Sequence, residues 1–286
     1  MKRLLITGAN SYVGNAFKQW AEDQYSELIH VDTVGMRDGA WKQRSFEGYD
    51  AILHAAGIAH VSTDKSMEDL YYKVNTDLTA EVAAKAKRSG VKQFIFLSSM
   101  IVYGDASNAQ IITRDTVPKP TNFYGDSKLQ AENKLAELAD EMFMVANVRP
   151  PMIYGKGSKG NYVKLAGLAQ KIPFFPSYQN KRSMIHIDNL SEFLARIVLN
   201  ADSGTFHPQN KEYVCTTDLV STIGSVHGNT VRRIGLFNGV IDKLIDRNVT
   251  VNKLFGDFSY DKELSVYRDE YCVRSFEESI VETEKN

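Results

Sequence analysis

Three residues of this 286-residue chain have the types and the order that proton exchange with a hydroxyl or a carbonyl needs: Ser99, Tyr124 and Lys128. Ser99 closes a mainly apolar run, so we expect its hydroxyl at the carboxyl end of a strand. The spacing of Tyr124 and Lys128 places them one turn apart on the same face of a helix. A neighbouring ammonium favours the phenolate form, so we expect Lys128 to lower the pKa of Tyr124 from about 10 towards the working range. Tyr124 would then exchange a proton with a substrate oxygen that Ser99 also hydrogen-bonds.

The same tyrosine–lysine spacing also occurs on surface helices without any role in chemistry, so it needs support from other motifs. A glycine-containing turn near the N-terminus is the first of these. Gly8 permits a sharp turn after an apolar strand, and Gly14 lets the following helix pack close to the sheet. N–H groups at the helix start would face a pyrophosphate, although an ordinary strand-to-helix turn is the alternative. Ser11 stands where a third glycine is usual, and its hydroxyl can hydrogen-bond a phosphate. The expected cofactor contacts in this turn are Gly8, Asn10, Ser11, Tyr12, Val13 and Gly14.

Asp32 indicates which cofactor the turn would hold. It closes the second expected strand, where an acidic side chain can accept hydrogen bonds from the ribose hydroxyls of NAD. Its carboxylate would repel the 2′-phosphate of NADP. Arg37 and Arg44 follow shortly afterwards, and a flexible arginine there could serve NADP. NAD(H) is therefore favoured and NADP(H) is the alternative, with hydride transfer at a nicotinamide beside Tyr124.

The elements that must position these residues follow from the alternation of short apolar runs with amphipathic stretches over residues 1–150, which is typical of a parallel sheet with crossover helices. The expected strands are 3–7, 27–32, 51–56, 93–98 and 144–148, and the expected helices 14–22, 65–88 and 124–141. The pattern predicts a doubly wound α/β fold, a Rossmann parallel sheet, with a smaller, discontinuous C-terminal substrate-binding cap. We assign residues 1–153 and about 183–206 to the dinucleotide-binding core. Residues from about 154–182 and 207–286 form the cap.

Composition excludes several classes of function. The 34 basic and 35 acidic residues give a net charge of −1, so the chain has no general basic field to gather nucleic acid or an anionic membrane. The two cysteines, Cys215 and Cys272, are isolated, and the apolar N-terminal run is too short for a signal sequence or a membrane span. The histidines lack zinc-site spacing, so we expect no metal. These features predict a cytoplasmic globular protein.

Together the motifs resemble those of the extended short-chain dehydrogenase/reductase family over essentially the whole chain. The matching segments are 7–14, Asp32, 54–57, Asn75, 98–99, 102–104, 124–128, 149–151 and 153–155. The resemblance implies a catalytic role for Ser99, Tyr124 and Lys128. It also implies cofactor contacts from Asp32, Ala55, Ala56, Gly57, Asn75, Tyr124 and Lys128.

The resemblance also suggests where a nucleotide sugar would bind. Asn161 and Arg182 match positions that contact its diphosphate, and an arginine fork can bond two phosphate oxygens at once. Arg233 would add a second cation from the cap, and His60 lies near the sugar by chain path. The apolar stretch 173–176 could form a wall for uracil. Solvated arginines, a loop asparagine and a buried cap core are the alternatives.

Within the family the chain resembles UDP-sugar 4-epimerases and, more closely, the 4-ketoreductases that make UDP-linked deoxyamino sugars for bacterial surface polysaccharides. Only a short segment joins Asp32 to Asp50, which leaves the adenine side open and favours an exchangeable cofactor. We therefore favour reduction of a UDP-4-keto-6-deoxy-N-acetylhexosamine, with a UDP-glucose or UDP-N-acetylglucosamine 4-epimerase as the alternative. A catalytically silent NAD(P)-binding sensor is the third hypothesis. The resemblance also implies a homodimer through helices 75–88 and 124–141, where Ala83, Ala84 and Ala86 would permit close approach.

Overall fold

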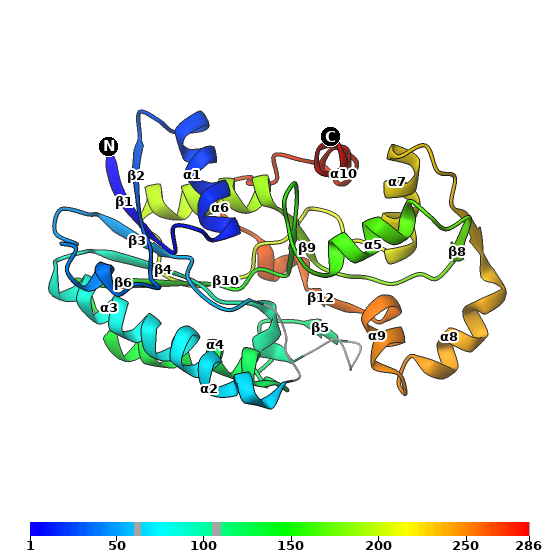
Figure 1. The fold of residues 1–286 in the computed structure, drawn as a ribbon, viewed down its shortest axis with the longest axis horizontal. Helices are drawn as coiled ribbons and strands as arrows, with labels where there is room; N and C mark the ends of the chain where they lie inside the picture. Colours follow the sequence, from blue (N-terminus) through cyan, green and yellow to red (C-terminus); the bar gives the residue numbers. More distant parts are fainter. Residues whose placement is uncertain (60–63, 105–109, 286) are drawn as a thin grey trace. The chain divides into compact units, whose positions relative to one another are not determined.

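The computed structural model describes residues 1–59, 64–104 and 110–285 (Figure 1). The chain divides into two units. The first contains Met1–Gly104, Val117–Pro150 and Leu190–Pro208, and the second contains Asp105–Thr116, Pro151–Asn189 and Gln209–Asn286. The boundaries differ from the predicted ones, since residues 183–189 and the described residues 110–116 pack with the second unit. The assignment of these units to cofactor and substrate remains a prediction.

The first unit is built on a sheet of six parallel strands in the order β10-β6-β4-β3-β1-β2. Its strands are β1 (Lys2–Thr7), β2 (Ile29–Val34), β3 (Ala51–His54), β4 (Gln93–Leu97), β6 (Met144–Val148) and β10 (Gly204–Phe206). The predicted doubly wound α/β fold is confirmed. In the register, His54 of β3 pairs with Thr7 on one side and Phe96 on the other, so the carboxyl ends of the central strands meet at one edge.

Helices cover both faces of this sheet, with α1 and α6 on one face and α2, α3 and α4 on the other (Figure 1). They are α1 (Tyr12–Gln24), η1 (Ala40–Lys42), η2 (Lys65–Met67), α2 (Glu68–Tyr71), η3 (Tyr72–Asp77), α3 (Leu78–Arg88), η4 (Met100–Tyr103), α4 (Phe123–Leu138) and α6 (Ile187–Asn200). The predicted helix 65–88 is thus interrupted, and η3 within it is a π-helix. Between β2 and β3 the structure has only the single turn η1, as the short segment after Asp32 predicted.

The second strand begins two residues later than predicted. Leu28 lies in a turn, in which its N–H donates to the carbonyl oxygen of Tyr25 at 2.9 Å. The strand also ends two residues later than predicted, at Val34. Asp32 therefore lies inside β2, opposite Leu5, and not at the end of the strand.

The core of the first unit packs the sheet against α3 and α4. Leu5, Ile52 and Phe94 contribute from the strands. Ala83 and Ala86 of α3 belong to the same core and have no exposed surface, so they cannot provide the close approach to a second copy that the family resemblance implied. The small side chains are needed inside this unit, where they let α3 lie close to the sheet.

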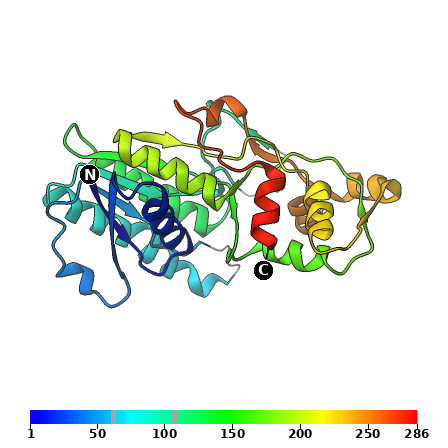
Figure 2. The same ribbon diagram turned by 90° about the horizontal axis from the view of Figure 1, so that it is seen from above.

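The second unit combines short strands with small helices. Its strands pair in parallel as β8 with β11, β5 with β12 and β7 with β9. These strands are β5 (Gln110–Ile112), β7 (Met152–Tyr154), β8 (Phe174–Pro176), β9 (Met184–His186), β11 (Arg232–Ile234) and β12 (Phe258–Tyr260). The helices are α5 (Asn161–Ala169), α7 (Thr216–Val226), η5 (Gly235–Phe237), α8 (Asn238–Leu244), α9 (Val249–Phe255), η6 (Lys262–Ser265) and α10 (Phe276–Glu284). The C-terminal helix α10, red in Figure 2, lies beside the yellow α7.

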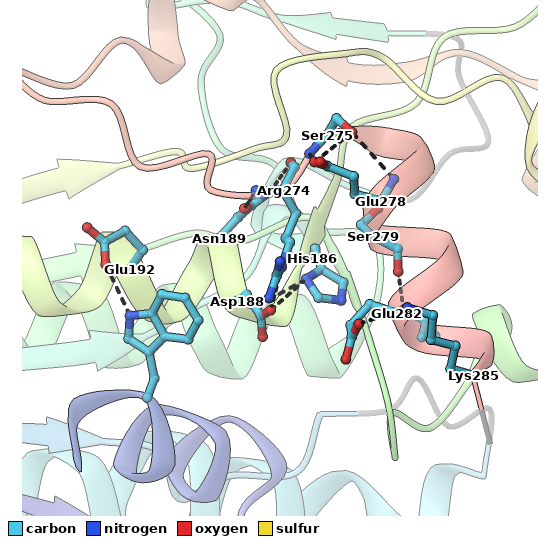
Figure 3. Close-up of polar contacts among 12 residues, drawn as sticks. His186, Asp188, Asn189, Glu192, Arg274, Ser275, Glu278, Ser279, Glu282 and Lys285 are labelled. Atoms are coloured by element: carbon cyan, nitrogen blue, oxygen red, sulfur yellow. Dashed lines mark hydrogen bonds and ion pairs between the residues drawn. The ribbon is translucent and has the colours of Figure 1, made fainter. Parts of the chain in front are cut away.

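Polar contacts hold α10 in the second unit (Figure 3). Ser275 and Glu278 form a capping box at its start, which satisfies two backbone N–H groups. Just before the helix, the Nε atom of Arg274 donates to Asp188 at 3.1 Å, and the backbone N–H of Arg274 donates to Asn189 at 2.9 Å. The end of the chain is therefore an integral part of this unit.

The described residues contain neither a helix that could span a membrane nor a cluster of metal ligands. None of the helices there is both long enough and apolar enough to cross a bilayer. Over the same residues, no three histidine, cysteine, aspartate or glutamate side chains gather where they could bind a metal ion.

Candidate active site

The turn between β1 and α1 passes unusually close to the turn after β3. Gly8 has a φ of +105°, which side chains rarely adopt, and a Cβ atom placed on it would lie 2.7 Å from the backbone nitrogen of Ala56. Ala55 and Ala56 therefore leave no room for a side chain at position 8. The close approach explains why glycine is required at this turn.

The start of α1 has the features of an anion-binding site. Ser11 is the N-cap residue, and its Oγ atom accepts a hydrogen bond from the N–H of Gly14 at 3.1 Å. A Cβ atom on Gly14 would lie 2.4 Å from Ser11 Oγ and 3.0 Å from Cγ2 of Ile6, so glycine allows the close packing of helix on sheet that was predicted. Asn10 lies in the turn before α1, and Tyr12 and Val13 are the first two residues of the helix. The first N–H groups of a helix have no partner within the helix, and this end of the dipole favours negative charge, so the cradle fits a diphosphate.

Asp32 projects from β2 into a cluster of polar groups. The hydroxyl of Tyr49 donates to its Oδ2 atom at 2.7 Å, and Arg3 and His30 each place a side-chain nitrogen 3.8 Å from the same oxygen. Arg44 donates in turn to the Tyr49 hydroxyl at 2.8 Å. The side chain of Asp32 is 32% exposed, which leaves it accessible to ribose hydroxyls, and Arg44 is connected to it through the Tyr49 hydroxyl.

Ser99, Tyr124 and Lys128 are brought together at the carboxyl edge of the sheet. Ser99 follows β4 and caps η4, where its Oγ atom accepts a hydrogen bond from the N–H of Ile101 at 3.3 Å, and its hydroxyl lies close enough to the Tyr124 phenol to act on the pKa of Tyr124. Lys128, one turn after Tyr124 on α4, is only 4% exposed. Its Nζ atom donates to the carbonyl oxygen of Leu97 at 2.8 Å and lies 4.7 Å from the ring centre of Phe96.

The pKa values of this group differ from the expectation. Burial raises the pKa of Tyr124 to about 12, although the hydroxyl of Ser99 acts in the opposite direction, so the predicted lowering by Lys128 is wrong. Burial also lowers the pKa of Lys128 to about 8, and the nearby charge of Glu132 opposes that change. Removal from water penalises both charged forms, and the sequence does not show how deeply the two side chains lie. In the protein alone, the proton of Lys128 is therefore held less tightly than that of Tyr124.

Asn75 has a supporting place beside these residues. It lies in the π-helix η3, a type of element that is frequent at functional sites, and it is fully buried. Its amide accepts from the N–H of Ile58 at 2.8 Å and donates to Ser127 Oγ at 3.1 Å, so it joins the turn after β3 to α4. A Cβ atom on Gly57 would lie 3.0 Å from the Asn75 Oδ1 atom and 3.1 Å from the Nζ atom of Lys128.

A buried ion pair next to this group was not predicted from the sequence. Glu132 lies one turn beyond Lys128 on α4, and it pairs with Arg149, which directly follows β6. Two signals could have found the pair. One is an acidic residue continuing the four-residue spacing of Tyr124 and Lys128, and the other is an arginine at the end of an apolar strand.

The candidate substrate residues that the structure describes all lie in the second unit. Arg182 donates from Nη1 to the carbonyl oxygen of Gly256 at 2.9 Å, and burial lowers its pKa to about 10. Arg233 is exposed on β11 and forms an ion pair with Asp218 at 2.6 Å. Asn161 is exposed at the first position of α5. Their part in binding a diphosphate stays a prediction.

Two further substrate predictions have different outcomes. Of the apolar stretch 173–176, Phe174 is 50% exposed, whereas Phe175 is buried and its ring centre lies 5.7 Å from that of Phe255. Of the two phenylalanines, Phe174 is therefore the one that offers a surface to a base. His60 lies outside the described residues.

Two curated relatives share parts of this chain. Over 155 residues it is 39% identical to a UDP-glucose 4-epimerase from Vibrio cholerae, which covers 51% of this chain and 47% of that protein. Over 219 residues it is 30% identical to N-acetyl-alpha-D-glucosaminyl-diphospho-ditrans,octacis-undecaprenol 4-epimerase from Escherichia coli O157:H7, which covers 70% of this chain and 64% of that protein. The chain thus spans less than two thirds of the length of either relative.

A solved structure extends the likeness in fold to nearly the whole chain. UDP-glucuronic acid 4-epimerase from Bacillus cereus in complex with NAD superposes with a TM-score of 0.75 at 16% sequence identity, over 98% of this chain and 96% of that one. At this identity the likeness shows the fold alone. Residues 4–213, however, match the sequence model of a family, and they carry the glycine turn, the Ser99, Tyr124 and Lys128 group, and the Glu132–Arg149 pair. The resemblance predicted from the motifs is thus confirmed, and the chain belongs to the NAD dependent epimerase/dehydratase family.

Proposed function

We propose that this protein is an NAD-dependent 4-epimerase of a nucleotide sugar, with a UDP-hexose as substrate. One observation carries the proposal: the Ser99 hydroxyl lies beside Tyr124, with Lys128 one turn away on α4, at the sheet edge where Gly8 forms a diphosphate cradle. The two curated relatives, at 39% and 30% identity, are both 4-epimerases, and this supports epimerisation over the reduction that the sequence favoured.

In this proposal the three residues handle the proton at the sugar oxygen. When bound, the nicotinamide supplies the acceptor and donor of the hydride at C4. Tyr124 must first be in its phenolate form, which the charges of Lys128 and of a bound oxidised nicotinamide would favour over the phenol of the protein alone. The phenolate takes the proton from the C4 hydroxyl, and the phenol later returns it to the C4 oxygen presented from the other face. Ser99 donates a hydrogen bond to that oxygen, and Lys128 stabilises the phenolate with its ammonium charge.

NAD(H) is the cofactor that the first unit fits best. The cradle at Gly8 and Gly14 suits a pyrophosphate, and the carboxylate of Asp32 would accept from ribose hydroxyls while repelling a 2′-phosphate. NADP(H) is the second choice, because Arg44, which is hydrogen-bonded to Tyr49 beside Asp32, could pair with its 2′-phosphate.

The second unit would bind the diphosphate of the substrate. Arg182 presents a guanidinium whose fork can bond two phosphate oxygens, and Asn161 and Arg233 would add a polar and a cationic contact. Because one curated relative acts on a sugar linked to undecaprenol through a diphosphate, a lipid-linked glycosyl diphosphate is the alternative substrate of the same chemistry.

Reduction of a UDP-4-keto-6-deoxy-N-acetylhexosamine is the second candidate function. The observation in its favour is that only η1 (Ala40–Lys42) joins β2 to β3, with no crossover helix on the adenine side. A more open adenine side favours a cofactor that leaves after each turnover, which a reductase requires and an epimerase does not.

Cofactor content separates these functions. The purified protein is denatured, and the released nicotinamide is measured by absorbance before any substrate is added. Stoichiometric NAD, followed by interconversion of UDP-glucose or UDP-N-acetylglucosamine with the C4 epimer, supports the epimerase. An empty protein that oxidises NADH or NADPH with a UDP-4-ketosugar establishes the reductase instead. If the protein converts only the lipid-linked glycosyl diphosphate and no UDP-sugar, the substrate is the lipid-linked sugar.

Two variants make this test specific. Tyr124→Phe removes the phenol oxygen and should abolish turnover with either substrate. Tyr25→Phe removes a hydroxyl that donates to Glu192 elsewhere in the first unit, and it should leave turnover unchanged. A protein that binds cofactor but turns over neither UDP-sugars nor lipid-linked sugars would point to the sensor.

We also propose a homodimer, which the family resemblance implies, and a cytoplasmic location, which the two isolated cysteines favour. Size-exclusion chromatography with light scattering tests the first of these. A mass of about twice the 32.1 kDa of the chain would support it.

A further inference from the structure

The ion pair of Glu132 and Arg149 is the most deeply buried one in the described part of the first unit. Glu132 is 5% and Arg149 8% exposed. The carboxylate receives the arginine in a fork, from Nε at 3.0 Å and from Nη2 at 2.5 Å. Burial of two charges often stabilises a protein no more than apolar residues of the same volume would, so such a pair calls for a role beyond stability.

Further bonds connect the pair to both ends of the turn that carries Ser99. Before Ser99, the hydroxyl of Ser98 donates to Oε1 of Glu132. After it, Arg149 donates from Nη1 to the hydroxyl of Tyr103 at 2.6 Å, at the end of η4. Between them, the N–H of Met100 donates to the carbonyl oxygen of Pro150, next to Arg149, at 3.0 Å. The backbone on either side of Ser99 is therefore held by residues that follow β6 or lie on α4.

Glu132 also belongs to the helix face that carries the other two reactive groups. Tyr124, Lys128 and Glu132 follow one another at intervals of four residues on α4, which stacks them along one side of the helix. One carboxylate thus contacts the Ser99 turn while its own helix holds Tyr124 and Lys128. The placement of the Ser99 hydroxyl beside Tyr124 depends on how these two elements are placed.

The charge of Glu132 acts on Lys128. The other titratable groups near Lys128 are Tyr124 on the same helix and His54 at the end of β3, and burial lowers the pKa of His54 to about 3 and so keeps it neutral. Arg149, from the end of β6, is bound to the carboxylate of Glu132. Glu132 is therefore the anion that favours the ammonium form of Lys128 against the cost of burial.

We propose that Glu132 is a positioning residue for the reaction: it holds the Ser99 turn against α4 through Ser98 and Arg149, and its negative charge stabilises the buried ammonium of Lys128. The effect of Glu132 on Lys128 rests on the proposed function in one respect, namely that the reaction needs the ammonium form of Lys128. It can therefore be tested without substrate.

The test follows the titration of Lys128 in protein labelled with ¹³C-lysine. The Cε resonance of Lys128 is assigned by its loss in Lys128→Met, and its shift is recorded against pH by NMR. In Glu132→Gln, which keeps the shape but loses the charge, the midpoint should fall by roughly 1 pH unit. In Glu132→Asp, which keeps the charge, the midpoint should move much less. An unchanged midpoint in folded Glu132→Gln would overturn the proposed effect of charge.

Glu192 offers a matched control. It is also a buried glutamate of the first unit, and it binds Arg196 at 2.7 Å, Trp20 at 3.1 Å and Tyr25 at 2.7 Å. Glu192→Gln should disturb stability without moving the Lys128 midpoint. An equal shift in this variant would show a general effect of lost stability and would also overturn the proposal.

Activity then tests the positioning role. Glu132→Asp retains the charge but reaches one methylene less far, so kcat should fall about tenfold or more with KM nearly unchanged, as expected for a misplaced reacting group. A rise in KM alone would contradict this role. If Glu132→Gln does not fold, Glu132→Gln with Arg149→Met removes both charges, and a lowered Lys128 midpoint remains the expected result. A lowered midpoint in protein that converts no UDP-sugar would contradict the proposed function and leave the effect on Lys128 in place.

Discussion

The ammonium of Lys128 donates a hydrogen bond to the carbonyl oxygen of Leu97 at 2.8 Å. Leu97 is the last residue of β4 and stands two residues before Ser99, so this bond joins helix α4 directly to the strand that presents the serine. The lysine therefore has a structural partner as well as a charge. Protonation of Lys128 strengthens the hydrogen bond to Leu97 and supplies the positive charge.

The rate should fall as the pH rises through the pKa of Lys128. Burial lowers this pKa to about 8, so the ammonium is present below pH 8 and is lost above it, and the phenolate of Tyr124 loses its stabilising charge with it. The pH profile of kcat with UDP-glucose measures the decline. In Lys128→Arg the charge persists to much higher pH, so any remaining activity should lack this decline. A profile that is flat to pH 10 in the unsubstituted protein would exclude Lys128 as the controlling group.

Gly8→Ala should weaken cofactor binding strongly. The new Cβ would lie 2.7 Å from the backbone nitrogen of Ala56 at a φ of +105°, so the turn must move away from the position that forms the cradle. We expect a loss in NADH affinity of at least about tenfold, equivalent to about 1.4 kcal/mol, in a fluorescence titration.

Gly90→Ala is the matched control for that variant. Gly90 also has a positive φ, of +76°, but no atom lies within 4 Å of the added Cβ. This variant should lose some stability and keep its affinity for NADH. Equal losses of affinity in both would show that backbone strain, and not the approach of Ala56, is responsible.

Asp32→Ser should shift the cofactor preference towards NADPH. The substitution removes the charge that would repel a 2′-phosphate, while Arg44 remains beside Tyr49. We expect the ratio of NADPH to NADH affinity to rise about tenfold, or about 1.4 kcal/mol. Titration of both cofactors checks this, with Asp23→Asn on the exposed side of α1 as the control that should leave the ratio unchanged. An unaltered ratio in Asp32→Ser would place the ribose away from β2.

Arg149→Met should destabilise the protein severely. The change leaves the carboxylate of Glu132 buried without its partner, and breaking a buried pair costs about 3–5 kcal/mol of unfolding free energy. Urea denaturation measures the loss. The double variant Glu132→Leu with Arg149→Met should recover most of the stability, because no unpaired charge remains. Lys42→Ala, which breaks an exposed pair with Glu81, should change stability little.

Much of the candidate site could be predicted because its geometry is local. The residues of the glycine turn are neighbours in the chain, and a spacing of four on a helix is enough to align Tyr124 with Lys128. The strand from Met144 to Val148 has the bounds that its apolar run predicted. The start of β2 was misplaced because the turn at Leu28 depends on a hydrogen bond to Tyr25 that the apolar pattern does not show.

The amino-acid sequence by itself determined the family, the parallel α/β fold and the grouping of Ser99, Tyr124 and Lys128, because these depend on hydrophobic period, glycine positions and short spacings. Only the tertiary structure decided the pKa directions of Tyr124 and Lys128 and the partners of Glu132. The physical reason is that desolvation and a buried ion pair arise from segments far apart in the chain. Their effect depends on how deeply the fold encloses them.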